Sequence, residues 1–440
     1  MSAAASHTIG ERAHSEVWAR IATERVLATG AIAVVAVHVA DDNFLQREPG
    51  TSAAGHLVSG LAPLAVLAGV AVWYRGARPG VRATLALLAG FFGVLSGTEA
   101  AYYTLNGGPS GDDFTGIVAM LAGFVLLVVG AVTLWRSRRI DERRLRRYLR
   151  RAALTVGALV LISQVLFPTA IAYVVTHTAR AEVPAPNLGA AHEEVAFTTS
   201  DGLRLQGWFI PPRNGATVIA FPGRSGPQKQ TRMLVSHGYG VLLFDRRGEG
   251  ASEGDPNTFG WHGERDLHAA AAYLRTRADV DPDRIGGIGL SVGGEMLIRA
   301  AAGSDAFKAI VAEGASGQSL RDGIANGEMS ATAILADGSI TLATALFTND
   351  LPPPSLKSEV SRIAPGAVFF VYGERGQGGT ETKPNHGFYD AAREPKQIWE
   401  VPGGQHVAGI TTKPKEYERR VVGFFDRALL QRTSSERSTP

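Results

Sequence analysis

The chain has 440 residues, 45% of them hydrophobic, a formal net charge of +3 and no cysteine. This length exceeds that of one ordinary domain, so at least two units are expected. The absence of cysteine excludes disulfides, thiolate metal sites and a cysteine nucleophile. The small net charge, with its arginine excess concentrated in residues 136–151, argues against a nucleic-acid partner.

The amino-terminal part contains five long apolar stretches, at about residues 26–40, 57–74, 83–105, 114–135 and 152–175. Most approach the ~20 residues that a helix needs to cross the ~30 Å hydrocarbon core of a bilayer, and the first does so only if it continues through Phe44 and Leu45. No small-residue cleavage site follows the first stretch, which argues against a secretory signal peptide. We therefore expect residues 1–176 to form an integral membrane domain with about five transmembrane helices, located in the cell membrane.

Lysine and arginine residues alternate between the loops of this region. The first 25 residues contain three, and the following four loops contain one, three, none and nine. Positive residues are retained on the cytoplasmic side, so the amino terminus, the second loop and the fourth loop are predicted to lie inside. Five spans then place everything after residue 176 on the extracytoplasmic side. The basic run at 136–151 is interpreted as a topogenic loop rather than a site for anionic lipid.

Residues 177–192 are polar and rich in turn formers, and predict a linker. Residues 431–440 are expected to be a disordered tail. Between them, strand patterns and helix patterns alternate, which is typical of a mostly parallel sheet covered by helices on both faces. The expected strands are 193–199, 203–210, 216–221, 240–244, 285–289, 308–312, 367–372 and 396–401, and the expected helices are 227–237, 261–276, 295–302, 387–392 and 415–430.

The central motif is Gly289-Leu290-Ser291-Val292-Gly293. An apolar strand ends there and a helix begins at once, which is the pattern of a nucleophile elbow that exposes a serine hydroxyl at the top of a sheet. The same glycines, with Gly287 before them and Glu313 after the next apolar run, also suggest a dinucleotide-binding fingerprint. That fingerprint belongs at the start of an α/β unit, whereas several strands precede this one, so the elbow interpretation is preferred.

Three other motifs occur in order around the elbow: Phe221-Pro222-Gly223, the segment from Phe244 to Gly254, and Gly403-Gly404-Gln405-His406. With these four motifs, residues 193–430 resemble the α/β-hydrolase family, in the serine-nucleophile branch that contains esterases and serine aminopeptidase-like enzymes. The resemblance implies hydrolysis of a carboxylic ester or thioester through an acyl-enzyme on Ser291. It implies a small acyl substrate and neither cofactor nor metal.

Ser291 requires a base, because a hydroxyl is a poor nucleophile at neutral pH. His406 lies in a glycine-rich loop after the last predicted strand, where the family's order of serine, acid and histidine places the base. Family members commonly carry an aspartate at the position of Gly376 in this chain. The acid is therefore expected to be Glu381, with Glu374 as the alternative, because the glycines between them allow Glu381 to fold back towards His406.

An oxyanion hole needs backbone N–H groups and no particular side chain. The elbow geometry assigns one donor to Val292, and the loop after Phe221-Pro222-Gly223 is expected to supply the second from Arg224.

Residues 314–366 occupy the place where the family carries its lid, with short helices expected at 319–334 and 340–347. An ester or thioester is preferred to a peptide, because neither a propeller nor an acidic amine-binding cap is visible in the sequence. A peptidase or acyltransferase of the same fold remains an alternative, as does a catalytically inactive binding module.

Overall fold

The computed structural model describes residues 22–107, 111–137, 143–317, 319–327 and 329–431. The tail predicted at 431–440 lies outside these residues except for its first position. The chain divides into two compact units. A helical unit comprises Met1–Arg47, Ser52–Val174 and Leu346–Asn349, and a sheet unit comprises Glu48–Thr51, Val175–Ala345 and Asp350–Pro440.

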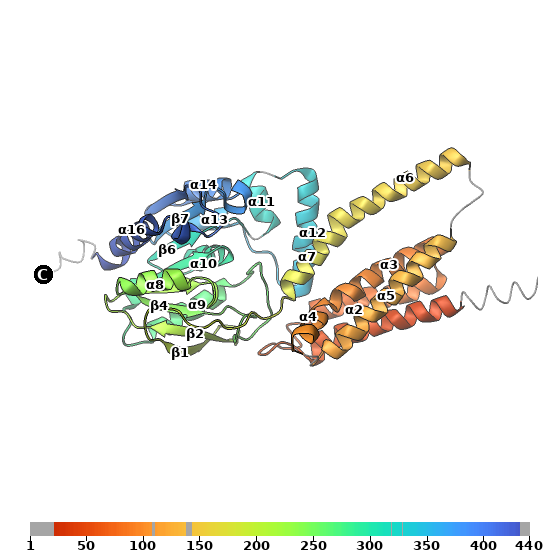
Figure 1. The fold of residues 1–440 in the computed structure, drawn as a ribbon, viewed down its shortest axis with the longest axis horizontal. Coiled ribbons are helices and arrows are strands. Elements are labelled where there is room, and N and C mark those ends of the chain that lie inside the picture. Colours follow the sequence, from red (N-terminus) through yellow and green to blue (C-terminus); the bar gives the residue numbers. More distant parts are fainter. Residues whose placement is uncertain (1–21, 108–110, 138–142, 318, 328, 432–440) are drawn as a thin grey trace, which may run out of the picture. The chain divides into compact units, whose positions relative to one another are not determined.

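Among the described residues, five helices or helix pairs in this part of the chain are long and apolar enough to cross a membrane: Ala22–Leu45, Leu57–Gly76, Pro79–Asn106, Asp113–Arg136 and Arg144–Thr176. They coincide with the five apolar stretches of the sequence. The labelled elements are α2 (Leu57–Gly76), α3 (Pro79–Ser96), α4 (Thr98–Gly107), α5 (Asp113–Arg136), α6 (Arg144–Leu161) and α7 (Phe167–Thr176) (Figure 1). Because α6 begins at Arg144, the second half of the basic segment is helical instead of a loop, as suits a residue of high helix propensity.

Small residues allow α3 and α5 to approach closely. A Cβ added at Gly93 would lie 3.1 Å from the Cα of Gly123. At one end of the unit, Arg82 pairs with Glu24 at 3.1 Å, and at the other end the Thr115 hydroxyl donates to Asp41 at 2.7 Å. The start of the first helix therefore lies beside the start of α3, and its end lies beside the start of α5. The first helix thus runs parallel to α3 and antiparallel to α5.

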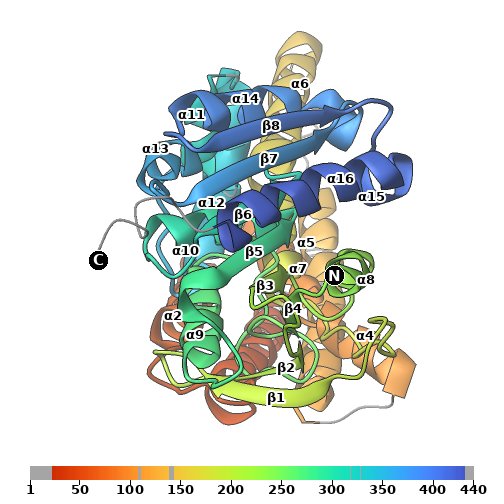
Figure 2. The same cartoon turned by 90° about the vertical axis from the view of Figure 1, so that its left-hand side faces the viewer.

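The sheet unit is built on one eight-stranded sheet of order β1-β2-β4-β3-β5-β6-β7-β8 (Figure 2). The first two strands are antiparallel to their neighbours, and all strands from β4 to β8 in this order are parallel. This is the expected mostly parallel sheet. The strands are β1 (Glu193–Thr198), β2 (Arg204–Ile210), β3 (Thr217–Phe221), β4 (Gly240–Phe244), β5 (Ile285–Leu290), β6 (Ala309–Glu313), β7 (Ala367–Gly373) and β8 (Lys396–Val401).

Helices cover both faces of this sheet. Alternate residues of one strand point to opposite faces, so Ile219 and Phe221 of β3 belong to one apolar core while Val218 and Ala220 belong to the other. The first core includes side chains of α9 (Glu264–Arg275), α10 (Val292–Ala302) and α14 (Thr382–Ala391), and the second those of α8 (Gln228–Ser236) and α16 (Pro414–Phe425). Helix α14 starts earlier than predicted, because Pro384 lies in its first turn, where no intrahelical N–H donor is needed.

The lid insert forms α11 (Leu320–Asn326), α12 (Ala331–Thr348) and the short α13 (Leu356–Glu359). The two helices predicted at 319–334 and 340–347 are thus wrong in their bounds, because α12 continues through the segment that was expected to separate them. Helix α12 is also apolar and long enough to cross a membrane. However, the strands that flank the insert pair with each other, with Ala309 opposite Ala367. A single crossing would separate these strands across the bilayer, so α12 is not a span.

Candidate active site

Ser291 lies between the end of β5 and the start of α10, with φ 52° and ψ −126°. A positive φ is strained for a non-glycine residue and is typical of functional turns. The turn also depends on its glycines: a Cβ at Gly289 would lie 2.4 Å from the Gly293 oxygen, and a Cβ at Gly293 would lie 2.4 Å from Cδ of Pro222. The sequence thus folds here as the predicted elbow, with the Ser291 side chain only partly buried.

His406 comes from the loop after β8 and faces the serine. Its Nε2 lies 2.8 Å from the Ser291 Oγ. The loop passes close to Gly314, where a Cβ would lie 3.0 Å from the imidazole. The hydrogen bond to Glu381 raises the pKa of His406, against the opposing effect of partial burial. The imidazole is therefore within reach of the serine proton and is more basic than an ordinary histidine.

Glu381, at the residue before α14, completes this chain of contacts. Its fully buried carboxylate contacts Nδ1 of His406 through Oε1 and accepts the Gly373 N–H through Oε2 at 3.2 Å. A Cβ at Gly376 would lie 2.2 Å from the same carboxylate. The side chain of Glu381 therefore fills the space that an aspartate at position 376 would enter, which explains why this chain carries glycine there.

The alternative acid, Glu374, is exposed and points elsewhere. Its Oε2 accepts the N–H of Gly403 at 2.7 Å. It thus braces the turn that leads into the His406 loop. The structure brings Ser291, His406 and Glu381 together, and it does not bring Glu374 to the imidazole.

The two expected oxyanion donors differ in their surroundings. Val292 is the first residue of α10, where the N–H has no acceptor within the helix. The N–H of Arg224 instead donates to Oδ1 of Asp245 at 2.8 Å, and its guanidinium pairs with the same carboxylate at 2.6 Å. The structure therefore differs from the prediction that Arg224 supplies the second donor. Its N–H is bonded to Asp245, which directly follows the adjacent strand β4. The sequence does not reveal this contact between neighbouring strands.

Two buried carboxylates near the site were not predicted as site residues. Glu313, at the end of β6, accepts the Gly409 N–H at 2.8 Å and the Tyr417 hydroxyl at 2.6 Å. Burial raises the pKa of Glu313. Glu295 of α10 accepts the N–H groups of Ser316 and Gly317 at the start of the lid insert. Glu313 thus holds the segment after His406, which replaces the dinucleotide-binding role considered for it from the sequence.

A cavity of about 630 Å³ opens beside Ser291. Its walls come from the linker, from the loop after β3, from α8 and from the segment after His406. The residues that line it are Pro184, Ala185, Asn187, Pro222, Ser225, Gly226, Gln228, Lys229, Gln230, Arg232, Leu290, Ser291, Val407, Ile410 and Thr411. This set contains two cations, Lys229 and Arg232, and no carboxylate. Within the described residues no group of three or more histidine, aspartate or glutamate side chains could hold a metal ion.

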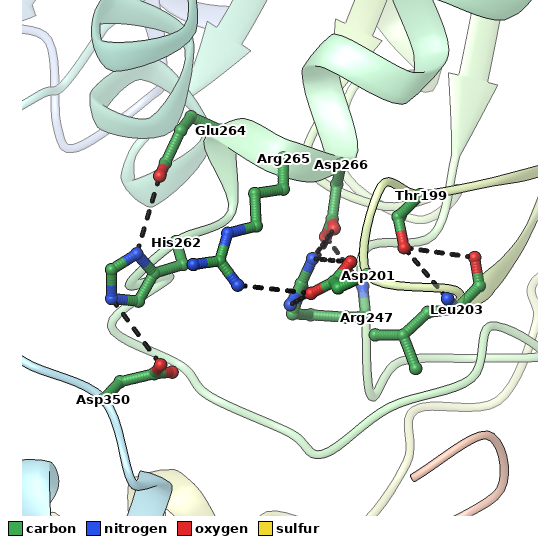
Figure 3. A network of polar contacts seen from close by, with 9 residues as sticks. All are labelled: Thr199, Asp201, Leu203, Arg247, His262, Glu264, Arg265, Asp266 and Asp350. Carbon is green, nitrogen blue, oxygen red and sulfur yellow. Dashed lines mark hydrogen bonds and ion pairs between the residues drawn. The ribbon is translucent and has the colours of Figure 1, made fainter. Parts of the chain in front are cut away.

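The loop after β4 is fixed by a second polar network (Figure 3). Arg247 donates from its backbone N–H and its guanidinium to the fully buried Asp266 of α9, and its guanidinium also pairs with Asp201. In the same view, His262 lies between Glu264 and Asp350, at 3.6 Å from each. The charges of this loop therefore form local pairs, and they contact neither Ser291 nor His406.

Comparison with protein-family models gives a match to X-Pro dipeptidyl-peptidase (S15 family) over residues 172–367, which is less than half of the chain. Among curated proteins, the chain is similar to the uncharacterized protein YfhR of Escherichia coli (strain K12). The two are 28% identical over 248 residues, covering 54% of this chain and 81% of YfhR. The polyketide transferase grgF of Penicillium sp is 35% identical over 117 residues, covering 25% of this chain and 40% of that protein.

Among solved structures, the chain is similar to the Pyrococcus furiosus esterase Pf2001. The TM-score is 0.47 and the sequence identity 24%, with 57% of this chain and 97% of that chain covered. Similarity to the crystal structure of the Penicillium protein GrgF has a TM-score of 0.47 and 21% identity, covering 55% of this chain and all of that one.

Proposed function

We propose that this chain, a member of the α/β-hydrolase family, is a membrane-anchored serine hydrolase. Its proposed substrates are carboxylic esters or thioesters. The observation that carries the proposal is the series of contacts from Ser291 through His406 to the buried Glu381. A nucleophile, a base and an orienting acid in hydrogen-bond reach are the arrangement that acyl transfer needs. The same arrangement speaks against a catalytically inactive binding module.

In the proposed reaction, the Ser291 Oγ attacks the substrate carbonyl while His406 Nε2 takes its proton. Glu381 orients the imidazole and stabilises its charged form. The Val292 N–H stabilises the tetrahedral oxyanion, and Ser225, which lines the cavity next to Arg224, is the candidate for the second N–H. His406 then protonates the leaving alkoxide or thiolate. Water, activated by the same imidazole, hydrolyses the acyl-enzyme and restores Ser291.

An ester is favoured over an amino-terminal peptide by the charge of the cavity. A dipeptidyl-peptidase acts at a free amino terminus, so its site must accept an ammonium group. The cavity beside Ser291 has no carboxylate in its lining and carries Lys229 and Arg232, which repel a cation. The peptidase named by the family model is therefore the weaker candidate for this chain.

Acyl transfer to an alcohol is the second candidate function. The acyl-enzyme can be resolved by an alcohol in place of water. The observation that favours it is the similarity to a protein named as a polyketide transferase.

We further propose that the five apolar helices of the helical unit anchor the chain in the cell membrane and that the sheet unit lies on the extracytoplasmic side. The length and composition of these helices support the anchor, and the arginine distribution supports the orientation.

Labelling with a fluorophosphonate probe tests the nucleophile. The wild-type chain in detergent should label and should hydrolyse short acyl 4-nitrophenyl esters, whereas Ser291→Ala should do neither. Ser225→Ala is the matched control, because it removes a hydroxyl from the same cavity and should still label. Equal labelling of Ser291→Ala and wild type would exclude Ser291 as the nucleophile, and an unlabelled wild-type chain would favour the inactive module.

A further inference from the structure

We propose that the substrate of this site is an anionic ester, whose carboxylate or phosphate group is held by Lys229 and Arg232 in the cavity beside Ser291. The inference rests on the proposed serine hydrolase function and names its substrate class. It concerns the wall of the cavity formed by α8, which none of the proposed chemical steps uses.

Lys229 and Arg232 are three residues apart on α8 and both line the cavity that contains Ser291. Residues with this spacing lie on the same face of a helix. The two cations therefore act on one region of the cavity. A substrate bound to Ser291 occupies this cavity, so part of it lies beside them.

The charges around the cavity do not cancel these two cations. The neighbouring carboxylates are already neutralised, since Asp245 pairs with Arg224 and Glu249 pairs with Arg246. In the described part of the chain, neither Lys229 nor Arg232 forms an ion pair with a carboxylate. Arg232 donates instead to the neutral backbone oxygen of Asn187 at 2.6 Å. The cavity thus carries an uncompensated positive charge that favours an anion.

The wall is also fixed in place before any substrate binds. Gln228 accepts the N–H of Asn187 at 3.1 Å, and the next residue, Leu188, is buried in the apolar core. Gln230, which lines the same cavity, is almost fully buried. The linker therefore lies against α8 through several contacts, and the position of Arg232 is set by them. A preorganised cationic wall loses little free energy on ordering when an anion binds.

The test compares two esters that differ only at the end remote from the scissile bond, as a carboxylate or as its methyl ester: mono-4-nitrophenyl adipate and 4-nitrophenyl methyl adipate. The wild-type full chain in detergent should have the higher kcat/KM for the anionic ester. Lys229→Gln and Arg232→Gln should each reduce the ratio of the two kcat/KM values roughly three- to tenfold, as expected for a charged contact at a partly exposed site. Added salt screens the charges and should therefore also reduce this ratio in the wild-type chain.

Control variants separate charge from structure. Lys308→Gln removes a cation at the amino end of β6, the opposite end of the sheet from Ser291, and should leave the ratio unchanged. Arg232→Lys keeps the charge while changing the contact with the linker, so it should retain most of the preference. Lys229→Glu should shift the preference towards the neutral ester.

The same comparison is made with the anion on the leaving group, using acetyl esters of 4-hydroxy-3-nitrobenzoate and of its methyl ester. A preference on either side of the scissile bond that depends on Lys229 and Arg232 supports the proposal. Ser291-dependent hydrolysis with no preference for an anion on either side overturns it and leaves the serine hydrolase assignment intact. Absence of Ser291-dependent labelling and turnover would instead remove the function on which it rests.

Discussion

The backbone N–H of Ser291 donates to the carbonyl oxygen of Glu313 at 2.7 Å, and the side chain of the same glutamate holds the segment after His406. Ser291 and His406 are 115 positions apart in sequence. Glu313, the last residue of β6, nevertheless forms hydrogen bonds both with the nucleophile and with the segment that follows the base. A shift of β6 against β5 would displace both groups. Their distance of 2.8 Å thus depends on the pairing of the central strands.

This relationship predicts that Glu313→Gln lowers kcat/KM by about tenfold, since one buried hydrogen bond to Gly409 or Tyr417 becomes unfavourable. The carboxylate also helps to raise the pKa of His406, so its removal should move the acid limb of the pH–rate profile to lower pH. Tyr417→Phe is the matched control, because it loses one hydrogen bond and keeps the charge. It should reduce the rate without moving the acid limb. An unchanged profile in Glu313→Gln would contradict this role.

Glu381→Gln and Glu374→Gln form a matched pair that assigns the acid. Glu381→Gln should lower kcat roughly 10³- to 10⁴-fold, because the imidazole loses the partner that fixes its tautomer. Glu374→Gln should stay within a few-fold of wild type, since its carboxylate only accepts the Gly403 N–H. The measurement is ester hydrolysis at several pH values. Comparable losses in both variants would show that the contact between Glu381 and His406 does not orient the base.

The pH dependence of activity follows from the same contact. The hydrogen bond to Glu381 raises the pKa of His406, and His406 acts as a base only in its neutral form. The rate should therefore rise with pH through a pKa above that of an ordinary histidine. The free energy of unfolding changes with pH in the opposite direction to the rate. The raised pKa of His406 stabilises the folded chain at pH values below the unfolded-state pKa of about 6.5. This stabilisation is lost as pH rises through the folded-state pKa. If the acid limb of the kcat/KM profile had an apparent pKa below the ordinary histidine value of about 6.5, it would contradict this expectation.

Gly293→Ala should abolish activity and destabilise the sheet unit by about 1–3 kcal/mol, because the new Cβ would overlap Pro222. Gly338→Ala on α12 is the control. Its Cβ would meet only Leu320, at 3.8 Å, and alanine favours a helix by about 0.5–1 kcal/mol over glycine. Thermal unfolding in detergent, followed by circular dichroism, compares the stabilities of the two variants, and ester hydrolysis compares their activities. Full activity in Gly293→Ala would mean that the elbow has room for a Cβ beside Pro222, contrary to this packing.

The network of Figure 3 predicts two different costs for removing a partner of Arg247. Asp266→Asn should destabilise the sheet unit by about 3–5 kcal/mol, because Asp266 is fully buried and the Arg247 side chain is only 15% exposed. Asp201→Asn should cost about 0–1 kcal/mol, since that carboxylate is about one-third exposed and solvent screens the pair. Thermal unfolding of both variants and of the wild-type chain measures the two losses of stability. Equal losses in Asp266→Asn and Asp201→Asn would contradict the prediction.

Acid should weaken the contact between Arg247 and Asp201. Burial alone would raise the pKa of Asp201, but hydrogen bonds with Arg247 and Thr199 outweigh it and lower the pKa. A lowered pKa gives stability that is present above the unfolded-state value of about 3.9 and is lost as pH falls towards the folded-state value. The wild-type chain should therefore lose slightly more stability than Asp201→Asn between pH 5 and pH 2, and parallel curves would exclude this contribution.

The orientation in the membrane can be tested in the cysteine-free chain. Asp305→Cys, at a side chain that is 88% exposed, should react with an impermeant maleimide in intact cells, and Arg78→Cys in the second loop should react only after lysis. The reverse pattern would place the sheet unit in the cytoplasm.

The features that depend on local pattern could be predicted from the amino-acid sequence. Glycines around Ser291 predicted the elbow, alternating strand and helix patterns predicted the parallel sheet, and uninterrupted apolar runs predicted the five long helices. Each of these follows from backbone geometry or hydrophobic periodicity within some twenty residues or fewer. The placement of His406 could also be predicted, because the loop after the last strand has a fixed position in this topology.

Which groups meet across the chain depends on how the strands and loops pack in three dimensions. Glu381 and Glu374 are both close in sequence to the end of β7, and packing alone directs the first to His406 and the second to Gly403. The N–H of Arg224 is lost to Asp245 because β3 and β4 are neighbours in the sheet. The pairing of β6 with β7 excludes α12 as a span. These outcomes depend on contacts between residues far apart in sequence, which local patterns do not encode.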